Sequence, residues 1–302
     1  MINDNSIALQ ISNLFKVYGN QKKALDDVSL CIPEGSFYAL LGPNGAGKSS
    51  LINILSDTST ATKGQITFFG KNLFTDKMWC KRRLGIVPQE AAFDPFFKVK
   101  EILHITAGLY GQKLETKWLD ELLSRLQLDE HADKNARQLS GGMRRRLLIA
   151  QALVHKPPFI VLDEPTAGVD AELRRQLWSF VQELNQQGST ILLTTHYLEE
   201  AQMLCNKVAI LNQGKIICEQ NMQDMINVFA QRELVLQFNK PILEPQLADF
   251  KIQSDQKTMR ITLNTEMSFH AAYSQAVQHY GEPCQVDIQQ ENLEDIFLRV
   301  TQ

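Results

Sequence analysis

A glycine-rich segment at residues 42–49 (Gly-Pro-Asn-Gly-Ala-Gly-Lys-Ser) has the residue types and spacing of a phosphate-binding loop. Glycines let the backbone turn tightly, so that consecutive N–H groups point at phosphate oxygens, and the positive end of the following helix adds to the attraction. In such a loop Lys48 reaches the β- and γ-phosphates, and the Ser49 hydroxyl binds magnesium. The segment predicts a nucleoside triphosphate site formed by Gly42, Pro43, Asn44, Gly45, Ala46, Gly47, Lys48, Ser49 and Ser50.

Two acidic residues, Asp163 and Glu164, follow a continuous apolar run at residues 159–162. Such a run is typical of a parallel strand that is buried on both faces. Carboxylates at the carboxyl end of that strand lie where open α/β sheets bind their ligands, although acidic residues can also simply close a strand. Because the chain also carries a phosphate loop, we expect Asp163 to hold the magnesium shell and Glu164 to polarise an attacking water.

A second glycine-rich turn, Leu-Ser-Gly-Gly-Met, occupies residues 139–143 and precedes a helix that we expect to end near residue 154. As local structure, Ser140 is the N-cap of that helix, and the glycines allow a tight entry. A helix N-terminus with exposed N–H groups is also an anion site. The turn therefore predicts a second phosphate-binding element.

Together these motifs resemble the ATP-binding cassette (ABC) family, whose nucleotide-binding subunits drive transport across membranes. The resemblance covers approximately residues 7–225. Its motifs stand in the family's order, which is Tyr18, residues 42–49, Gln89, residues 139–143, Asp163 with Glu164, Asp170 and His196.

The resemblance implies a role for each of three further residues. Tyr18 matches the aromatic residue that stacks on adenine, and His196 matches the switch histidine that contacts the γ-phosphate. Gln89 matches the glutamine that senses magnesium and the attacking water. We expect ATP and Mg²⁺ as the bound groups.

The resemblance also implies a head-to-tail homodimer. In this family Ser140, Gly141 and Gly142 of one copy close on the γ-phosphate that Lys48 of the other copy holds, and Asp170 belongs to a loop that crosses the interface. Two departures from the commonest pattern, Met143 after the glycines and Ala-Gly-Val-Asp at residues 167–170, look like the branch that serves type-2 exporters.

The pattern of strands and helices predicts an α/β fold. We expect a P-loop NTPase (ABC ATPase) core with a mixed sheet over residues 1–225, including strands at 7–11, 28–32 and 37–41 and an inserted helical subdomain at about 90–155. After about residue 225 the motifs end and strand-like runs alternate with helix-like ones. Residues 226–302 therefore predict a C-terminal accessory α+β domain.

Composition narrows the functional classes. A net charge of -3 gives no electrostatic footprint for nucleic acid, so we interpret Arg144, Arg145 and Arg146 as a solvated helix face or as partners within the chain. Five cysteines without Cys-x-x-Cys spacing argue against a zinc ribbon, a redox motif or a disulfide framework. No apolar run approaches the roughly 20 residues that span a bilayer, and residues 1–5 lack the pattern of a signal peptide.

The resemblance implies an ATP-hydrolysing transporter subunit that powers export through a separate integral-membrane permease. Such a subunit is peripheral at the cytoplasmic face of the inner or plasma membrane. The alternative is a soluble ABC ATPase acting on the ribosome or DNA. Ribosome-acting members usually carry two cassettes in one chain, and this sequence has one. Chromosome-associated members carry a long coiled coil, and this sequence has no such heptad run. A GTPase lacks support because Asn-Lys-x-Asp is absent, and Lys48, Glu164 and His196 argue against a non-hydrolysing regulatory subunit.

Overall fold

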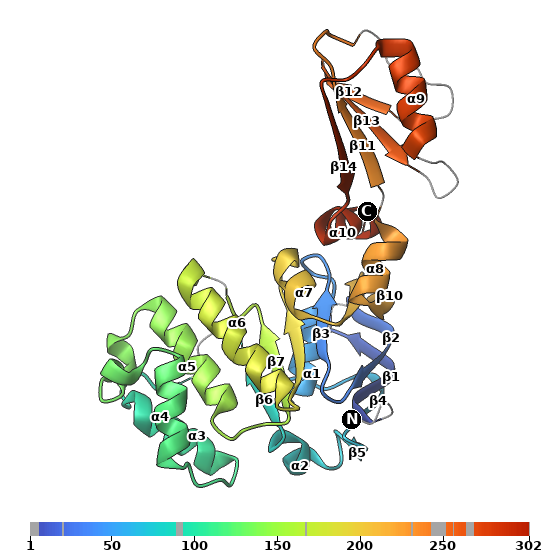
Figure 1. Cartoon of the computed structure of the whole chain (residues 1–302). Coiled ribbons are helices and arrows are strands. Elements are labelled where there is room, and N and C mark those ends of the chain that lie inside the picture. The colour runs from blue at the N-terminus through green and yellow to red at the C-terminus, as the bar shows by residue number, and fades with distance from the viewer. Residues whose placement is uncertain are drawn as a thin grey trace. The chain divides into compact units, whose positions relative to one another are not determined.

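The computed structural model describes residues 6–19, 21–88, 93–166, 168–230, 232–242, 252–255, 257–263 and 269–301. The chain forms two compact units, Met1–Met222 and Gln223–Gln302. The α/β class predicted from the sequence is confirmed in the first unit (Figure 1). Among the described residues, every helix is too short or too polar to span a lipid bilayer.

A six-stranded sheet forms the centre of the first unit, in the order β10-β9-β3-β8-β7-β6. All neighbours pair in parallel except the β9–β10 hairpin. Every residue of β3, β7 and β8 is buried, which explains their unbroken apolar runs. The strands are β3 (Phe37–Leu41), β6 (Leu84–Val87), β7 (Phe159–Asp163), β8 (Thr190–Thr194), β9 (Lys207–Asn212) and β10 (Lys215–Asn221).

A second, antiparallel sheet has the order β2-β1-β4-β5. Its apolar side chains share one core with β3 and α1, and Phe68 of β4 meets Phe159 of β7 edge to face, with 5.3 Å between the ring centroids. The elements are β1 (Ile7–Val17), β2 (Lys23–Pro33), β4 (Lys63–Phe68), β5 (Lys71–Asn72) and the helices α1 (Lys48–Leu55) and α2 (Lys77–Lys81).

The strands β1 and β2 are longer than the sequence predicts. Polar Asn13 and Asp27 interrupt the apolar alternation at the predicted ends, but the ladder continues past them. Both residues adopt positive φ (47° and 62°), and Asn13 Nδ2 donates a hydrogen bond of 2.8 Å to Asp27 Oδ1. The register shifts there mark an irregularity inside a strand pair, which single-strand periodicity cannot anticipate.

Helices dominate the segment between β6 and β7. They are α3 (Val99–Leu109), α4 (Thr116–Arg125), the short η1 (Asp129–His131) and η2 (Ala136–Gln138), and α5 (Gly141–Leu153). An apolar stripe on α4 and at its C-terminal end is buried and consists of Leu119, Leu122, Leu123 and Leu126. Two further helices follow β7 and β8, namely α6 (Ala171–Gln186) and α7 (Leu198–Leu204).

The second unit has its own core. Its four-stranded antiparallel sheet has the order β12-β13-β11-β14, and α9 packs on β11 and β13. The core side chains are Leu234, Leu236, Phe238, Met259, Ile261, Ala272 and Ala276. The elements are α8 (Met222–Phe229), β11 (Arg232–Gln237), β12 (Ile252–Asp255), β13 (Thr258–Leu263), α9 (Phe269–Tyr280), β14 (Gln285–Gln290) and α10 (Leu293–Thr301).

Candidate nucleotide-binding site

The phosphate loop connects β3 to α1 and requires glycine at two positions. A Cβ atom on Gly42 would lie 2.2 Å from the Leu211 carbonyl oxygen, and one on Gly47 would lie 2.4 Å from the Ala24 carbonyl oxygen. Gly47 is also the N-cap of α1 with a φ of 118°, a conformation that glycine alone adopts without strain. The carbonyl groups of Leu211 and Ala24 thus lie so close to the loop that a side chain at either position would clash with them.

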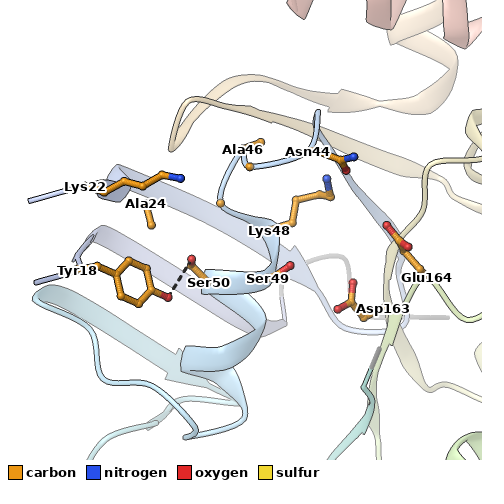
Figure 2. A pocket seen from close by; sticks show the side chains of 12 residues that line it. Tyr18, Lys22, Ala24, Asn44, Ala46, Lys48, Ser49, Ser50, Asp163 and Glu164 are labelled. Carbon is orange, nitrogen blue, oxygen red and sulfur yellow. Dashed lines mark hydrogen bonds between the residues drawn. The ribbon is translucent and has the colours of Figure 1, made fainter. Parts of the chain in front are cut away.

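This loop forms the floor of a cavity of about 260 Å³ (Figure 2). Tyr18 lies at one end of the cavity and Glu164 at the other. The lining residues are Tyr18, Lys22, Ala24, Asn44, Gly45, Ala46, Gly47, Lys48, Ser49, Ser50, Asp163 and Glu164. The structure therefore brings the predicted loop, the aromatic residue and the acidic pair together, and adds Lys22 and Ala24, whose place depends on the β1–β2 turn.

Tyr18 directly follows β1 and is 40% exposed. Its hydroxyl lies 3.2 Å from Ser50 Oγ, at hydrogen-bond distance, and Lys16 Nζ lies 4.8 Å from the ring centroid. The turn that carries it closes through the Tyr18 N–H, which donates to the Lys22 carbonyl oxygen at 3.1 Å. The exposed ring, fixed at its hydroxyl end, offers a flat apolar surface to a base.

The ammonium group of Lys48 lies within the loop. It donates hydrogen bonds to the carbonyl oxygens of Gly42 at 2.5 Å and Pro43 at 3.2 Å. Burial lowers the pKa of Lys48, while the nearby carboxylates of Glu164 and Asp163 oppose that shift. The lysine is therefore a cation held between a phosphate-binding loop and two acids.

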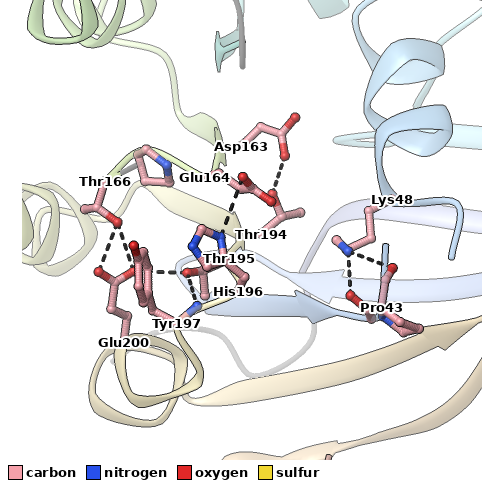
Figure 3. Close-up of polar contacts among 12 residues, drawn as sticks. Pro43, Lys48, Asp163, Glu164, Thr166, Thr194, Thr195, His196, Tyr197 and Glu200 are labelled. Carbon is pink, nitrogen blue, oxygen red and sulfur yellow. Dashed lines mark hydrogen bonds and ion pairs between the residues drawn. The ribbon is translucent and has the colours of Figure 1, made fainter. Parts of the chain in front are cut away.

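Asp163 is the last residue of β7 and is buried. Burial raises the pKa of its carboxyl group, and the charge of Glu164 adds to this. A hydrogen bond of 2.5 Å from Thr194 Oγ1 to Asp163 Oδ1 acts in the opposite direction (Figure 3). Thr194, opposite Asp163 in the β7–β8 ladder, was missed because nothing local marks its hydroxyl.

Glu164 turns away from the strand with a φ of 47°, which is unusual for a residue with a side chain. Its N–H donates to the Thr194 carbonyl oxygen at 3.0 Å. Its Oε2 atom lies 3.6 Å from His196 Nδ1 (Figure 3). The structure thus brings the predicted acid and the predicted histidine into contact, from the ends of adjacent strands.

The turn at residues 139–143 lies elsewhere. Ser140 caps α5, because its Oγ accepts a hydrogen bond from the Met143 N–H at 3.3 Å. Apart from the flanking residues and the helix's own backbone, the described chain has no heavy atom within 4 Å of a Cβ built on Gly141 or Gly142. Within the described part of the chain, the lining of the cavity includes no residue of this turn.

Asp170 is exposed and caps α6 through a 2.9 Å hydrogen bond that its Oδ1 accepts from the Leu173 N–H. That bond holds the pKa of Asp170 below its usual range. Two other predicted positions, Gln89 and Ala167, lie outside the described residues.

Arg145 corrects one interpretation of the arginine run. It is 8% exposed, so it is no part of a solvated face; it is instead an intrachain partner. Its guanidinium donates to the carbonyl oxygens of Asp163 at 2.6 Å and Glu164 at 2.9 Å, and also to those of Pro88 and Pro165. Its spacing from buried Ile149 and Ala152 on α5 was the available signal.

Comparisons with known proteins agree with this geometry. The family model described as "ABC transporter" matches residues 25–167. The chain is similar to the linearmycin resistance ATP-binding protein LnrL of Bacillus subtilis, with 31% identity over 97% of this chain and 98% of that protein. It is similar to the Nod factor export ATP-binding protein I of Ralstonia nicotianae, with 32% identity over 97% of this chain and 93% of that protein.

Among solved structures, a dimeric post-hydrolysis state of the ATP-binding cassette MJ0796 bound to ADP and Pi is similar, with a TM-score of 0.65 and 28% identity. That match covers 71% of this chain and 98% of the solved chain. The predicted ABC ATPase fold is therefore confirmed.

Proposed function

We propose that this chain, which belongs to the ABC transporter family and is one of its ATP-binding ATPases, powers export through a separate transmembrane permease. The observation that carries the proposal is the separation of two phosphate-binding elements. The loop at residues 42–49 lines a cavity with both acids, whereas the turn at residues 139–143 is outside it. A second copy then supplies the nucleotide that this turn contacts.

Within one copy, the cavity accommodates ATP along its length. The adenine stacks on Tyr18, and the phosphates lie on the backbone N–H groups of residues 42–49, at the N-terminus of α1. Lys48 then exchanges its carbonyl partners for the β- and γ-phosphates. The negative phosphates then compensate the energetic cost of burying part of the ammonium group.

The donors present fit magnesium, which prefers hydroxyl and carboxylate oxygens. Ser49 and Asp163 both line the cavity, and we propose that they hold the ion together with Gln89. Bound Mg²⁺ neutralises charge that develops on the transferring phosphoryl group. A cation also favours the ionised form of Asp163, which burial alone disfavours.

Glu164 and His196 are proposed to act on hydrolysis itself. Glu164 polarises the attacking water, and His196 contacts the γ-phosphate while its ring stays beside the Glu164 carboxylate. Loss of a positioned base typically slows a reaction by about 10²–10⁴-fold. Glu164→Gln is expected to fall in that range.

The exposed N-terminus of α5 is proposed to complete the site of a second copy, head to tail. Ser140, Gly141 and Gly142 present a helix end with open space around the glycines, which suits a γ-phosphate. Asp170, exposed at the start of α6, lies in the loop proposed to cross the interface. ATP binding closes the dimer, and hydrolysis reopens it.

Export is supported by the relative named for Nod factor export, which matches 97% of this chain. The permease would hold the chain at the cytoplasmic face of the membrane. The test is to capture a tagged full chain from detergent-solubilised membranes and identify what accompanies it by mass spectrometry. The proposal expects a multi-span integral-membrane protein; ribosomal proteins or DNA in its place would support the soluble alternative.

A further inference from the structure

A buried carboxylate outside the proposed catalytic set, that of Glu200, lies on α7 and is 6% exposed. Burying a charge is costly unless hydrogen bonds and an opposite charge compensate it. Thr166 Oγ1 donates to both of its oxygens, at 3.0 and 3.2 Å, and Thr195 Oγ1 donates to Oε2 at 3.1 Å (Figure 3). This carboxylate therefore joins two separate chain segments.

Each of those segments carries a residue proposed to act on ATP. Thr195 directly precedes His196, and its Oγ1 also accepts a hydrogen bond of 2.9 Å from the Tyr197 N–H. Thr166 lies two residues after Glu164. Because β7 and β8 are neighbours, their ends emerge side by side, and Glu200 ties the loop after one strand to the loop after the other.

Helix α6 supplies the opposite charge. Arg174 Nε lies 3.4 Å from Glu200 Oε1, and the two groups form an ion pair. The Arg174 guanidinium carbon lies 4.6 Å from the centroid of the Tyr197 ring, which in turn lies 4.0 Å from that of His196. Asp170 is the N-cap of α6, and its carbonyl oxygen accepts a hydrogen bond of 3.0 Å from the Arg174 N–H. The contacts therefore run from the proposed dimer interface to the histidine.

We propose that Glu200 is a positioning residue for ATP hydrolysis, which holds the His196 loop against the segment that follows Glu164. Glu200 is not among the described residues that line the cavity. The inference rests on the proposed roles of Glu164 and His196. A glutamine at this position offers one oxygen to hydroxyl donors that now share two, and it removes the charge that Arg174 faces.

The test uses the full chain with Glu200→Gln and, as matched control, the same change at the exposed neighbour Glu199. Partners that orient the ligands of a metal site typically matter by about 10–100-fold in affinity or activity, and we take the same range for Glu200. We expect kcat for ATP hydrolysis to fall by about that factor in Glu200→Gln with KM changed less than about twofold, and neither to change in Glu199→Gln. An unchanged kcat in Glu200→Gln overturns the proposal.

A double-mutant cycle separates positioning from general damage to the fold. In a His196→Ala background, measured by single-turnover hydrolysis of radiolabelled ATP, Glu200→Gln is expected to add less than about a twofold loss, because its effect passes through the histidine. An equal loss in both backgrounds overturns the proposal. If Glu200→Gln fails to fold, Thr195→Val, which removes one of the hydrogen bonds, takes its place with the same expectations.

The same measurements distinguish the two proposals. If Glu164→Gln and His196→Ala hydrolyse ATP at the unmodified rate, the proposed catalytic roles fail. If both lose activity while Glu200→Gln keeps it, the roles stand and the positioning inference alone fails.

Discussion

The Oε2 atom of Glu164 lies 3.6 Å from the Nδ1 atom of His196. Glu164 directly follows Asp163, and His196 lies two residues after Thr194. Asp163 and Thr194 face each other at the end of the β7–β8 ladder and share a hydrogen bond. The register of two buried strands therefore sets the distance between the acid and the histidine. The geometry of this proposed hydrolytic site therefore depends on the strand ends and on the side chains that hold the loops after β7 and β8 in place.

Arg145 is one such fixing group. Replacing it with lysine exchanges a planar group with five donors for an ammonium with three, so several carbonyl oxygens after β6 and β7 lose their partner. We expect the free energy of unfolding to fall by about 2–4 kcal/mol and ATP hydrolysis to slow. Urea denaturation and a phosphate-release assay measure both.

The adjacent Arg144→Lys is the control, because Arg144 is exposed and its guanidinium donates a hydrogen bond of 3.1 Å to the Arg137 carbonyl oxygen. That change is expected to alter stability by less than about 0.5 kcal/mol. Equal effects of the two changes would contradict the structural role assigned to Arg145.

Tyr18 tests the proposed adenine contact. Tyr18→Ala removes the ring, and since base–aromatic stacking is worth about 1–3 kcal/mol, the Kd for ATP is expected to rise about 5- to 150-fold. Tyr18→Phe keeps the ring and loses only the contact of its hydroxyl with Ser50. Isothermal titration calorimetry is expected to give Tyr18→Phe a Kd within about threefold of the unmodified chain; equal weakening in both variants would assign the affinity to the hydroxyl.

The sequence predicted the phosphate loop, the acidic pair and the helix cap at Ser140 because those signals are local. It did not reveal Arg145 or Glu200, whose partners lie on other elements. A run of three arginines looks solvated, but the middle one is buried and donates to the Asp163 carbonyl oxygen at the end of β7. The predicted strands of the β1–β2 hairpin were likewise too short. Asn13 and Asp27 form their hydrogen bond between the two strands, and no pattern within one strand reveals it.

His155 makes stability depend on pH. Burial lowers its pKa to about 4, its Nε2 lies 3.2 Å from the Leu84 carbonyl oxygen, and its ring stacks on Tyr110 with 3.8 Å between centroids. Between about pH 6.5 and 4 the unfolded chain binds a proton at this histidine that the folded chain does not. Stability contributed by the neutral ring is therefore present above pH 6.5 and is lost as the pH falls, by up to about 3 kcal/mol.

Urea denaturation at pH 7.5, 6 and 5 checks this expectation, with His155→Gln as the reference that removes the titrating ring. The fall in unfolding free energy between these pH values is expected to be smaller in the variant. Parallel curves for the two proteins would assign the pH dependence to other groups.

Ser140→Arg tests whether the turn at residues 139–143 serves the nucleotide of another copy. A bulky cation at the exposed N-cap of α5 is expected to stop hydrolysis by blocking dimer closure, while the Kd for ATP of the single chain changes less than about threefold, because this turn lies outside the cavity. Loss of ATP binding in the single chain would mean that the turn only supports the local fold.

The composite site is tested most directly by the mass of Glu164→Gln in solution. This variant keeps the cavity and the turn but is expected to stall before hydrolysis, so ATP stays bound. Size-exclusion chromatography with light scattering, at millimolar ATP and Mg²⁺, is predicted to give twice the 34.3 kDa of one chain, reverting to one chain when a chelator is added. A variant that binds ATP and stays at the mass of one chain would contradict the head-to-tail site.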